Sequence, residues 1–112
     1  MDVQQLRHLV GGWPGVGEDI KWGADLCLLV DAKMFCVTGL DGGALTIKVD
    51  PERFLELTEL PGVTPAPYLA RAKWVRVEAG ALPADDRDAL IRRSYELVRA
   101  GLGKARQRAL SD

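Results

Sequence analysis

The sequence has little of the chemistry on which enzymes and metal centres depend. Its 112 residues contain one histidine and two cysteines. Cys27 and Cys36 lack Cys-x-x-Cys spacing, and His8 lies far from both along the chain. Zinc needs three or four nitrogen, sulfur or oxygen ligands, and a nucleophile needs a neighbouring base. We therefore expect no metal, no cofactor and no enzymatic activity, and we expect the cysteines to be reduced hydrophobic residues.

Long hydrophobic runs and an excess of positive charge are also missing. No apolar stretch reaches the roughly 18–20 residues of a membrane helix. The first residues, Met1–Gln4, have neither the basic nor the apolar region of a signal peptide, so the expected location is the cytoplasm. The net charge is −1 and the pI is about 5.8, whereas proteins held on DNA by phosphate contacts are usually basic. This balance disfavours strong non-specific binding to DNA but permits a small basic face.

The length and composition fit a single domain. A chain of this size can bury roughly two thirds of its unfolded surface, which is enough for one core. The content of 47% hydrophobic and 28% charged residues is ordinary for a globular protein. Because no repeat, low-complexity tract or linker is evident, we expect one domain over residues 1–112 and a monomer.

Two helices are marked by the residues at their ends. Asp2–Gln5 has the form of a capping box, and Gly11-Gly12 ends the helix that follows. Asp50 can cap a second helix, with Pro51 in its first position. Pro61-Gly62 ends that helix.

The last helix is indicated by helical spacing of its apolar residues, after a cap at Asp85 or Asp86. Its stripe comprises Leu90, Ile91, Ser94, Leu97 and Val98, flanked by Tyr95. The basic tail that follows, 104–108, is only weakly helical in composition.

Between residues 18 and 49 the pattern changes to that of strands. Two β-rich runs lie on either side of Asp31-Ala32. A two-residue turn there would place Leu28 opposite Phe35 and Cys27 opposite Cys36. Asp-Ala is a weak match to the primed turns, which require positive φ angles.

The next turn, Asp41–Gly43, is predicted to be a three-residue loop ending in glycine. This loop would place Phe35 and Val37 on the buried face of the sheet. On the same face it would place Leu45, Ile47 and Val49. A last strand, 73–78, would direct Val75 and Val77 inward.

The order α-β-β-β-β-α-β-α predicts an α+β fold, a twisted antiparallel sheet with helices packed on one face. The outer face would carry Cys27, Leu29, Met34, Cys36, Thr38, Thr46, Lys48, Trp74, Arg76 and Glu78. A solvated face is normally more polar. Two interpretations remain open: the face is an interaction surface, or a loop such as 61–71 covers its apolar residues.

Several basic residues fall near the predicted turns. Lys33 and Lys48 belong to the hairpins, and Arg71 and Lys73 lead into the last strand. On hairpins that project from a sheet, such residues could bracket a phosphate backbone.

Seven segments together resemble the MmcQ/YjbR family of small bacterial proteins. They are Trp13-Pro14-Gly15-Val16, Ile20-Lys21-Trp22-Gly23, Lys33-Met34-Phe35, Leu45-Thr46-Ile47-Lys48-Val49, Pro65-Ala66-Pro67-Tyr68-Leu69, Lys73-Trp74-Val75 and Ser94-Tyr95-Glu96-Leu97-Val98. The segments span nearly the whole chain in order, which makes the set more specific than any single member.

The resemblance implies a frataxin-like (CyaY-like) fold and a double-wing mode of DNA binding by the hairpins. The positions that match the family's motifs are Lys33, Lys48, Lys73 and Trp74, and the resemblance implies a core role for Tyr95. Asp31-Ala32 departs from the glycines expected before the Lys-x-Phe motif.

Two hypotheses follow. In the first, the protein is a double-stranded DNA-binding module. Its phosphate contacts would be Lys33, Lys48, Arg71 and Lys73, with Trp74 or Arg76 against the backbone or bases. In the second, the protein is a protein-interaction module that uses the sheet face bearing Trp74, which suits the acidic pI better.

Overall fold

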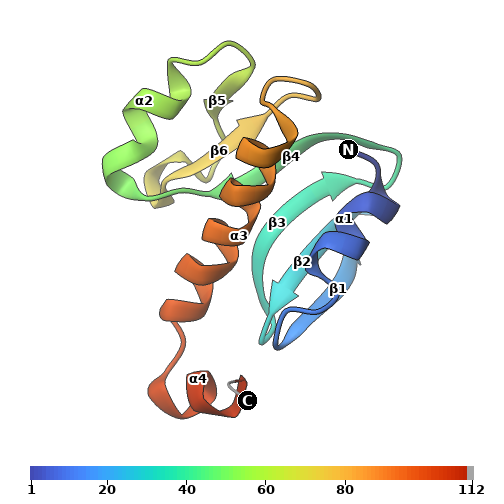
Figure 1. Ribbon diagram of the computed structural model, residues 1–112, viewed down its shortest axis with the longest axis vertical. Coiled ribbons are helices and arrows are strands. Elements are labelled where there is room, and N and C mark those ends of the chain that lie inside the picture. The colour runs from blue at the N-terminus through green and yellow to red at the C-terminus, as the bar shows by residue number, and fades with distance from the viewer. Residues whose placement is uncertain (111–112) are drawn as a thin grey trace.

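The computed structural model describes residues 1–110 as one antiparallel sheet with helices packed mainly on one face (Figure 1). In chain order the elements are α1 (Val3–Val10), β1 (Val16–Lys21), β2 (Asp25–Val30), β3 (Lys33–Gly39), β4 (Gly42–Lys48), the 3₁₀ turn η1 (Pro51–Arg53), α2 (Phe54–Thr58), β5 (Val63–Pro65), the 3₁₀ turn η2 (Ala70–Ala72), β6 (Trp74–Val77), α3 (Ala84–Ala100) and α4 (Lys104–Leu110). The predicted α+β class and the order of its main elements are confirmed. None of the helices in this part of the chain has the length and apolar character needed to cross a membrane.

The strands lie in the order β1-β2-β3-β4-β6-β5, and α1 and α3 pack on the same face (Figure 1). Strand β5 is an addition to the predicted elements. It is only three residues long and ends in Pro65. Proline has no N–H to donate, so such a strand is confined to a sheet edge and gives little signal in the sequence.

The predicted start of the first helix is confirmed, but two other predicted caps are wrong. Asp2 accepts a hydrogen bond from the Gln5 backbone N–H at 2.8 Å, and the Gln5 side chain accepts one from the Asp2 N–H at 2.9 Å. Pro51 does take the first position of η1, yet Asp50 makes no capping bond and instead accepts from Arg93 of α3 at 2.8 Å. Helix α3 begins after Pro83, which places the expected capping aspartates within its first turn.

The two-residue turn between β2 and β3 is confirmed, whereas the register beyond it is wrong. Asp31 and Ala32 have φ angles of 49° and 69°, as a primed turn requires. A β-bulge then interrupts the ladder between Leu28 and Leu29. Leu28 consequently pairs with Cys36 and Cys27 with Val37, instead of the predicted Phe35 and Cys36 partners.

The bulge changes which face the rest of β3 presents. Phe35 and Cys36 both belong to the core under the helices, so Cys36 was wrongly assigned to the outer face. Val37 pairs with Thr46 on the outer face, and Thr38 pairs with Leu45 on the inner face, which reverses both predictions. An extra residue in one strand inverts every side chain that follows it.

The β3–β4 turn also differs from the predicted three-residue loop. Gly39 pairs with Gly42, so Leu40 and Asp41 form the tip, and a second irregularity follows it. Gly42 and Gly43 have φ angles of 86° and 103°, which glycine adopts without steric cost. These two glycines therefore allow the backbone conformation of the irregularity beside the turn.

Ser94 of α3 reaches into the sheet where β3 and β4 separate. Its hydroxyl donates to the Phe35 carbonyl oxygen at 2.6 Å and accepts from the Lys48 N–H at 2.9 Å. These two strand residues follow the Cys36–Ile47 pair in the ladder. The hydroxyl therefore takes the place of a direct bond between the strands.

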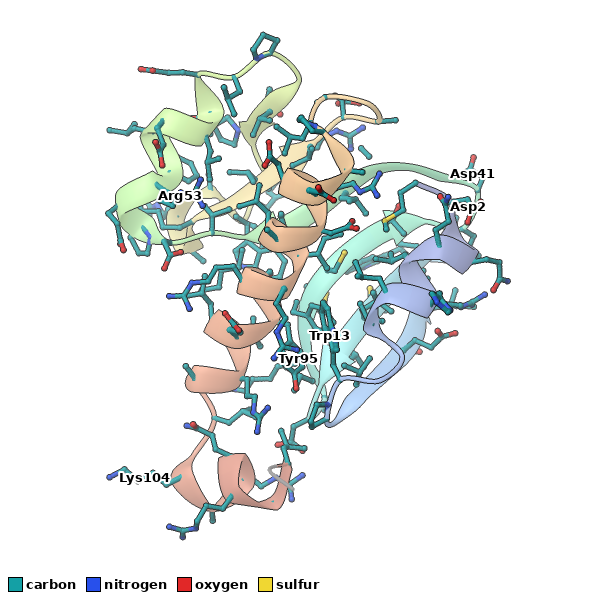
Figure 2. All side chains as sticks on the ribbon, in the orientation of Figure 1. Asp2, Trp13, Asp41, Arg53, Tyr95 and Lys104 are labelled. Carbon is teal, nitrogen blue, oxygen red and sulfur yellow. The ribbon has the colours of Figure 1, made fainter. Side chains whose placement is uncertain are left out.

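An aromatic cluster joins α3 to the segment after α1. Trp13 and Tyr95 lie side by side between these helices, with ring centroids 5.2 Å apart (Figure 2). The Tyr95 hydroxyl donates to the Pro14 carbonyl at 2.6 Å, and the Tyr95 ring meets Phe35 edge-on. The expected core role of Tyr95 is confirmed, and Val75 and Val77 are buried as predicted.

The basic tail forms α4, a helix that its composition alone did not favour. Arg106 forms an ion pair with Asp31 in the β2–β3 turn, and Leu110 lies against Gly15. The Gln107 side chain donates to the Leu102 carbonyl at 2.7 Å. Such contacts stabilise a short helix that would be marginal in isolation.

Candidate functional site

The face of the sheet turned away from α1 and α3 is the candidate binding surface, and we call it the open face. By strand register it carries Cys27, Leu29, Met34, Val37, Thr46, Lys48, Trp74 and Arg76. The residues between these positions belong to the core beneath the helices.

The open face is partly covered by the segment 66–69, which follows β5. The Ala66 N–H donates to the Trp74 carbonyl, and the Trp74 N–H donates to the Leu69 carbonyl. Trp74 is only 6% exposed and so has almost no surface to offer a partner. Residues 66–69 also line a cleft together with Met34, Val37 and Thr46 of the open face, as the covering-loop interpretation expected.

The basic residues suggested by the sequence do not form one surface. Lys48 and Arg76 share the open face, where Lys48 pairs across the ladder with Trp74 and Arg76 with Thr46. Arg76 is also held in an ion pair with Glu78 at 2.9 Å. Arg71 lies exposed in η2.

Two other predicted contacts, Lys33 and Lys73, lie outside the open face. Lys33 pairs with Val30, a core residue, and therefore lies at the turn on the helix side of the sheet. Lys73 has a φ angle of 63°, and its ammonium lies 5.0 Å from the centre of the Phe54 ring of α2. The predicted six residues thus occupy at least three regions of the surface.

The ion pairs of residues 1–110 all use arginine. The pairs are Arg7–Glu18, Arg53–Glu56, Arg76–Glu78, Arg87–Asp88, Arg92–Glu96, Arg93–Asp50, Arg93–Glu96 and Arg106–Asp31. In this part of the chain Lys33, Lys48, Arg71 and Lys73 form no ion pair with a carboxylate. Their charges remain available to an external anion.

A cleft of about 470 Å³ opens between the open face and the covering segment. Its lining residues are Trp22, Asp25, Met34, Val37, Thr46, Ala66, Pro67, Tyr68 and Leu69. The volume lies in the range of sites that hold a small molecule or a side chain of a partner. The lining is mostly apolar, with one carboxylate, that of Asp25.

Two aromatic side chains form the exposed parts of this cleft. Trp22 is 71% exposed and Tyr68 is fully exposed. Their φ angles are 53° and 64°, a left-handed conformation that costs a bulky residue about 1 kcal/mol. Both residues therefore hold large apolar side chains in water on strained backbone, and both line the same cleft.

Neither Trp22 nor Tyr68 is among the binding residues that the sequence predicts. Trp22 stood at the end of a strand pattern, before Gly23, and Tyr68 stood in a proline-containing loop. The available signal was the occurrence of an aromatic residue in each turn, where polar residues or glycine are usual. Their convergence on one cleft depends on the fold of segment 66–69 and has no local signature.

A second hollow, of about 490 Å³, lies between α1 and the start of α3. Its polar residues largely satisfy one another, since Asp2 and Gln5 form the capping box and Arg87 pairs with Asp88. We therefore regard the open-face cleft as the stronger candidate.

The two cysteines are buried thiols on opposite sides of the sheet. Both are free, and burial raises the pKa of Cys36 to about 12 and raises that of Cys27 as well. Thiols with raised pKa values are poor nucleophiles. No group of three or more possible ligands from His, Cys, Asp and Glu is gathered within residues 1–110.

The comparisons with known proteins agree with one another. The YjbR family model matches residues 11–97. The crystal structure of the Deinococcus radiodurans protein DR2400, described as a DUF419 domain, superposes with a TM-score of 0.86 at 30% identity, covering 97% of this chain and 87% of that one. A Pseudomonas syringae protein superposes with a TM-score of 0.70 at 23% identity, covering 87% and 98% of the two chains, and this likeness concerns the fold alone. Among curated proteins no match was found.

Proposed function

This chain belongs to the YjbR family, and we propose that it is a small non-enzymatic module that binds a protein partner on its open face. The cleft between Trp22 and Tyr68 receives a side chain of that partner. The observation that carries the proposal is the pair of exposed aromatic residues, both on left-handed backbone, that line one largely apolar cleft.

Tryptophan and tyrosine are enriched among the residues that contribute most to binding at protein interfaces. An aromatic side chain that faces water gives no folding stability in return for its backbone strain. Burial against a partner would supply that compensation, at about 25 cal/mol for each Å² of apolar surface removed from water. The net charge of −1 also suits a protein partner.

The test is a selection of displayed random peptides on the intact protein. Peptides that bind the wild type are measured again on Trp22→Ala and Tyr68→Ala variants, with Leu55→Ala as the control. Leu55 is a 76% exposed apolar residue of α2 that does not line the cleft. We expect at least about tenfold weaker binding with the cleft variants and no change with the control, since an interface anchor contributes about 1–2 kcal/mol or more. Peptides whose affinity survives both cleft substitutions would refute the proposal.

A second candidate function is binding of double-stranded DNA. The observation in its favour is that Lys33, Lys48, Arg71 and Lys73 form no ion pair within residues 1–110. Their separation over several regions and the acidic pI count against it. A titration of duplex DNA at several salt concentrations tests it. Absence of binding at about 50 mM salt, where phosphate contacts are strong, rules it out.

A further inference from the structure

We propose that the partner protein inserts an arginine side chain into the open-face cleft, the one lined by Trp22 and Tyr68. The inference rests on the proposed function and adds the chemistry by which the partner is recognised. Three features carry it: the charge of the lining, the aromatic rings at the opening, and an internal contact of the same kind.

The cleft combines an apolar floor with one negative charge. Of the residues between 1 and 110 that line it, Asp25 is the one with a charge. Within residues 1–110 the Asp25 carboxylate takes part in no ion pair, although Lys21 lies across from it in the ladder. Met34 and Val37 suit the aliphatic stem of a long side chain, and the carboxylate suits a cation at its end. A phosphate group in this cleft would be repelled by Asp25.

The two exposed rings add to the attraction for a cation. The face of an indole or phenol ring is electronegative and attracts cations, and in proteins the cation is more often arginine than lysine. A guanidinium can stack on an aromatic ring and donate to a carboxylate at the same time, because it is planar and has five donors. The compact, strongly hydrated ammonium of lysine fits this combination less well.

The same combination is already present elsewhere in this chain. The Arg92 guanidinium carbon lies 4.9 Å from the ring centre of Trp13 and 4.9 Å from that of Tyr95. The Arg92 side chain also donates to the Glu96 carboxylate at 3.3 Å. A tryptophan, a tyrosine and a carboxylate thus hold an arginine in that site. The open-face cleft offers a tryptophan, a tyrosine and a carboxylate without the arginine.

The experiment compares three short peptides that differ at one position. An acetylated Gly-Arg-Gly amide is titrated into the ¹⁵N-labelled protein, beside the same peptides with citrulline and with norleucine. Citrulline has nearly the shape of arginine but no charge, and norleucine keeps only an apolar stem. We expect millimolar binding of the arginine peptide, about fivefold to tenfold tighter than the citrulline peptide. The shifted amides should include those of Trp22, Asp25 and Tyr68.

Variants assign the preference to particular groups. Asp25→Asn removes the charge and keeps the shape, so the advantage of arginine over citrulline should fall to about twofold or less. Tyr68→Phe keeps the ring and should keep the advantage, whereas Tyr68→Leu should reduce it. The comparison on the wild type needs no variant and stays decisive if a variant unfolds.

The two proposals fail in different ways. Equal binding of the arginine and citrulline peptides, or no binding of the arginine peptide at several millimolar, overturns the arginine inference. If the norleucine peptide, or peptides selected on the intact protein, still bind through Trp22 and Tyr68, the proposed function stands without it. Failure of the selected peptides to depend on these two residues overturns the proposed function itself.

Discussion

Removing the hydroxyl of Ser94 tests the link that this residue forms between strands β3 and β4. In Ser94→Ala the Phe35 carbonyl and the Lys48 N–H lose the hydroxyl that links them at 2.6 Å and 2.9 Å. Ser94 is fully buried, so water has no access to replace it. Leaving a buried backbone group unsatisfied costs about 1–3 kcal/mol. We expect the two losses together to reduce the free energy of unfolding by about 3 kcal/mol.

The assay is reversible unfolding in urea, followed by circular dichroism. A domain of this size has a stability on the order of 5–15 kcal/mol, so the variant should still fold. Thr38→Val is the matched control, since the Thr38 hydroxyl makes only one bond, to the Ala44 carbonyl at 3.0 Å. We expect about 1 kcal/mol from that change. A loss for Ser94→Ala no larger than the loss for Thr38→Val would refute the reasoning.

Three further predictions concern other contacts. Tyr95→Phe should lower the free energy of unfolding by about 1–2 kcal/mol, because the hydroxyl that donates to the Pro14 carbonyl at 2.6 Å is lost while the ring stays. Urea unfolding measures this change, and an unchanged midpoint would contradict the prediction. Hydrogen bonds from Arg93 hold the pKa of Asp50 below its usual value. The stabilisation from this pair should be present at neutral pH and disappear as the pH falls from about 4 through the lowered pKa. The free energies of unfolding of the wild type and of Arg93→Ala should therefore converge in acid. A difference between them that stays constant with pH would be inconsistent with the pair. The Cys36 thiol, whose pKa burial raises to about 12, should not react with a thiol reagent at pH 8 until the protein unfolds; rapid labelling of the native protein would show the burial to be incomplete.

Local signals in the sequence predicted the class of fold and several of its boundaries. The Asp2 capping box, the Asp31-Ala32 turn and the inward direction of Val75 and Val77 were correct because each depends on neighbouring residues. The register of β3 was wrong, since nearly every residue of that run is apolar and alternation gives no reference. The extra residue of the bulge is Phe35, which lies between the paired residues Met34 and Cys36. Its carbonyl oxygen accepts a hydrogen bond from Ser94 of α3, a contact over 59 residues that no local pattern indicates.

The candidate site was less predictable than the fold. The sequence predicted ligand contacts at basic residues of the hairpins and the last strand, Arg71 and Arg76 included, and at Trp74. Side-chain type and spacing indicate where a residue lies in a strand, but not what another segment covers. The segment Ala66–Leu69 bonds to the Trp74 backbone and brings Tyr68 to a cleft that Trp22 also lines. This arrangement joins segments that are far apart in the sequence.

The link through Ser94 also has a consequence for the order in which the chain folds. The end of the β3–β4 ladder is completed by a residue that follows Lys48 by 46 positions. The hairpin can form early, but its open end remains unpaired until α3 has been synthesised and has docked. Contacts between such distant residues slow folding because the loop must close before they can form. On the ribosome, a nascent chain that stops before α3 would therefore expose an incomplete sheet, and docking of α3 is the step that commits the domain to its native state.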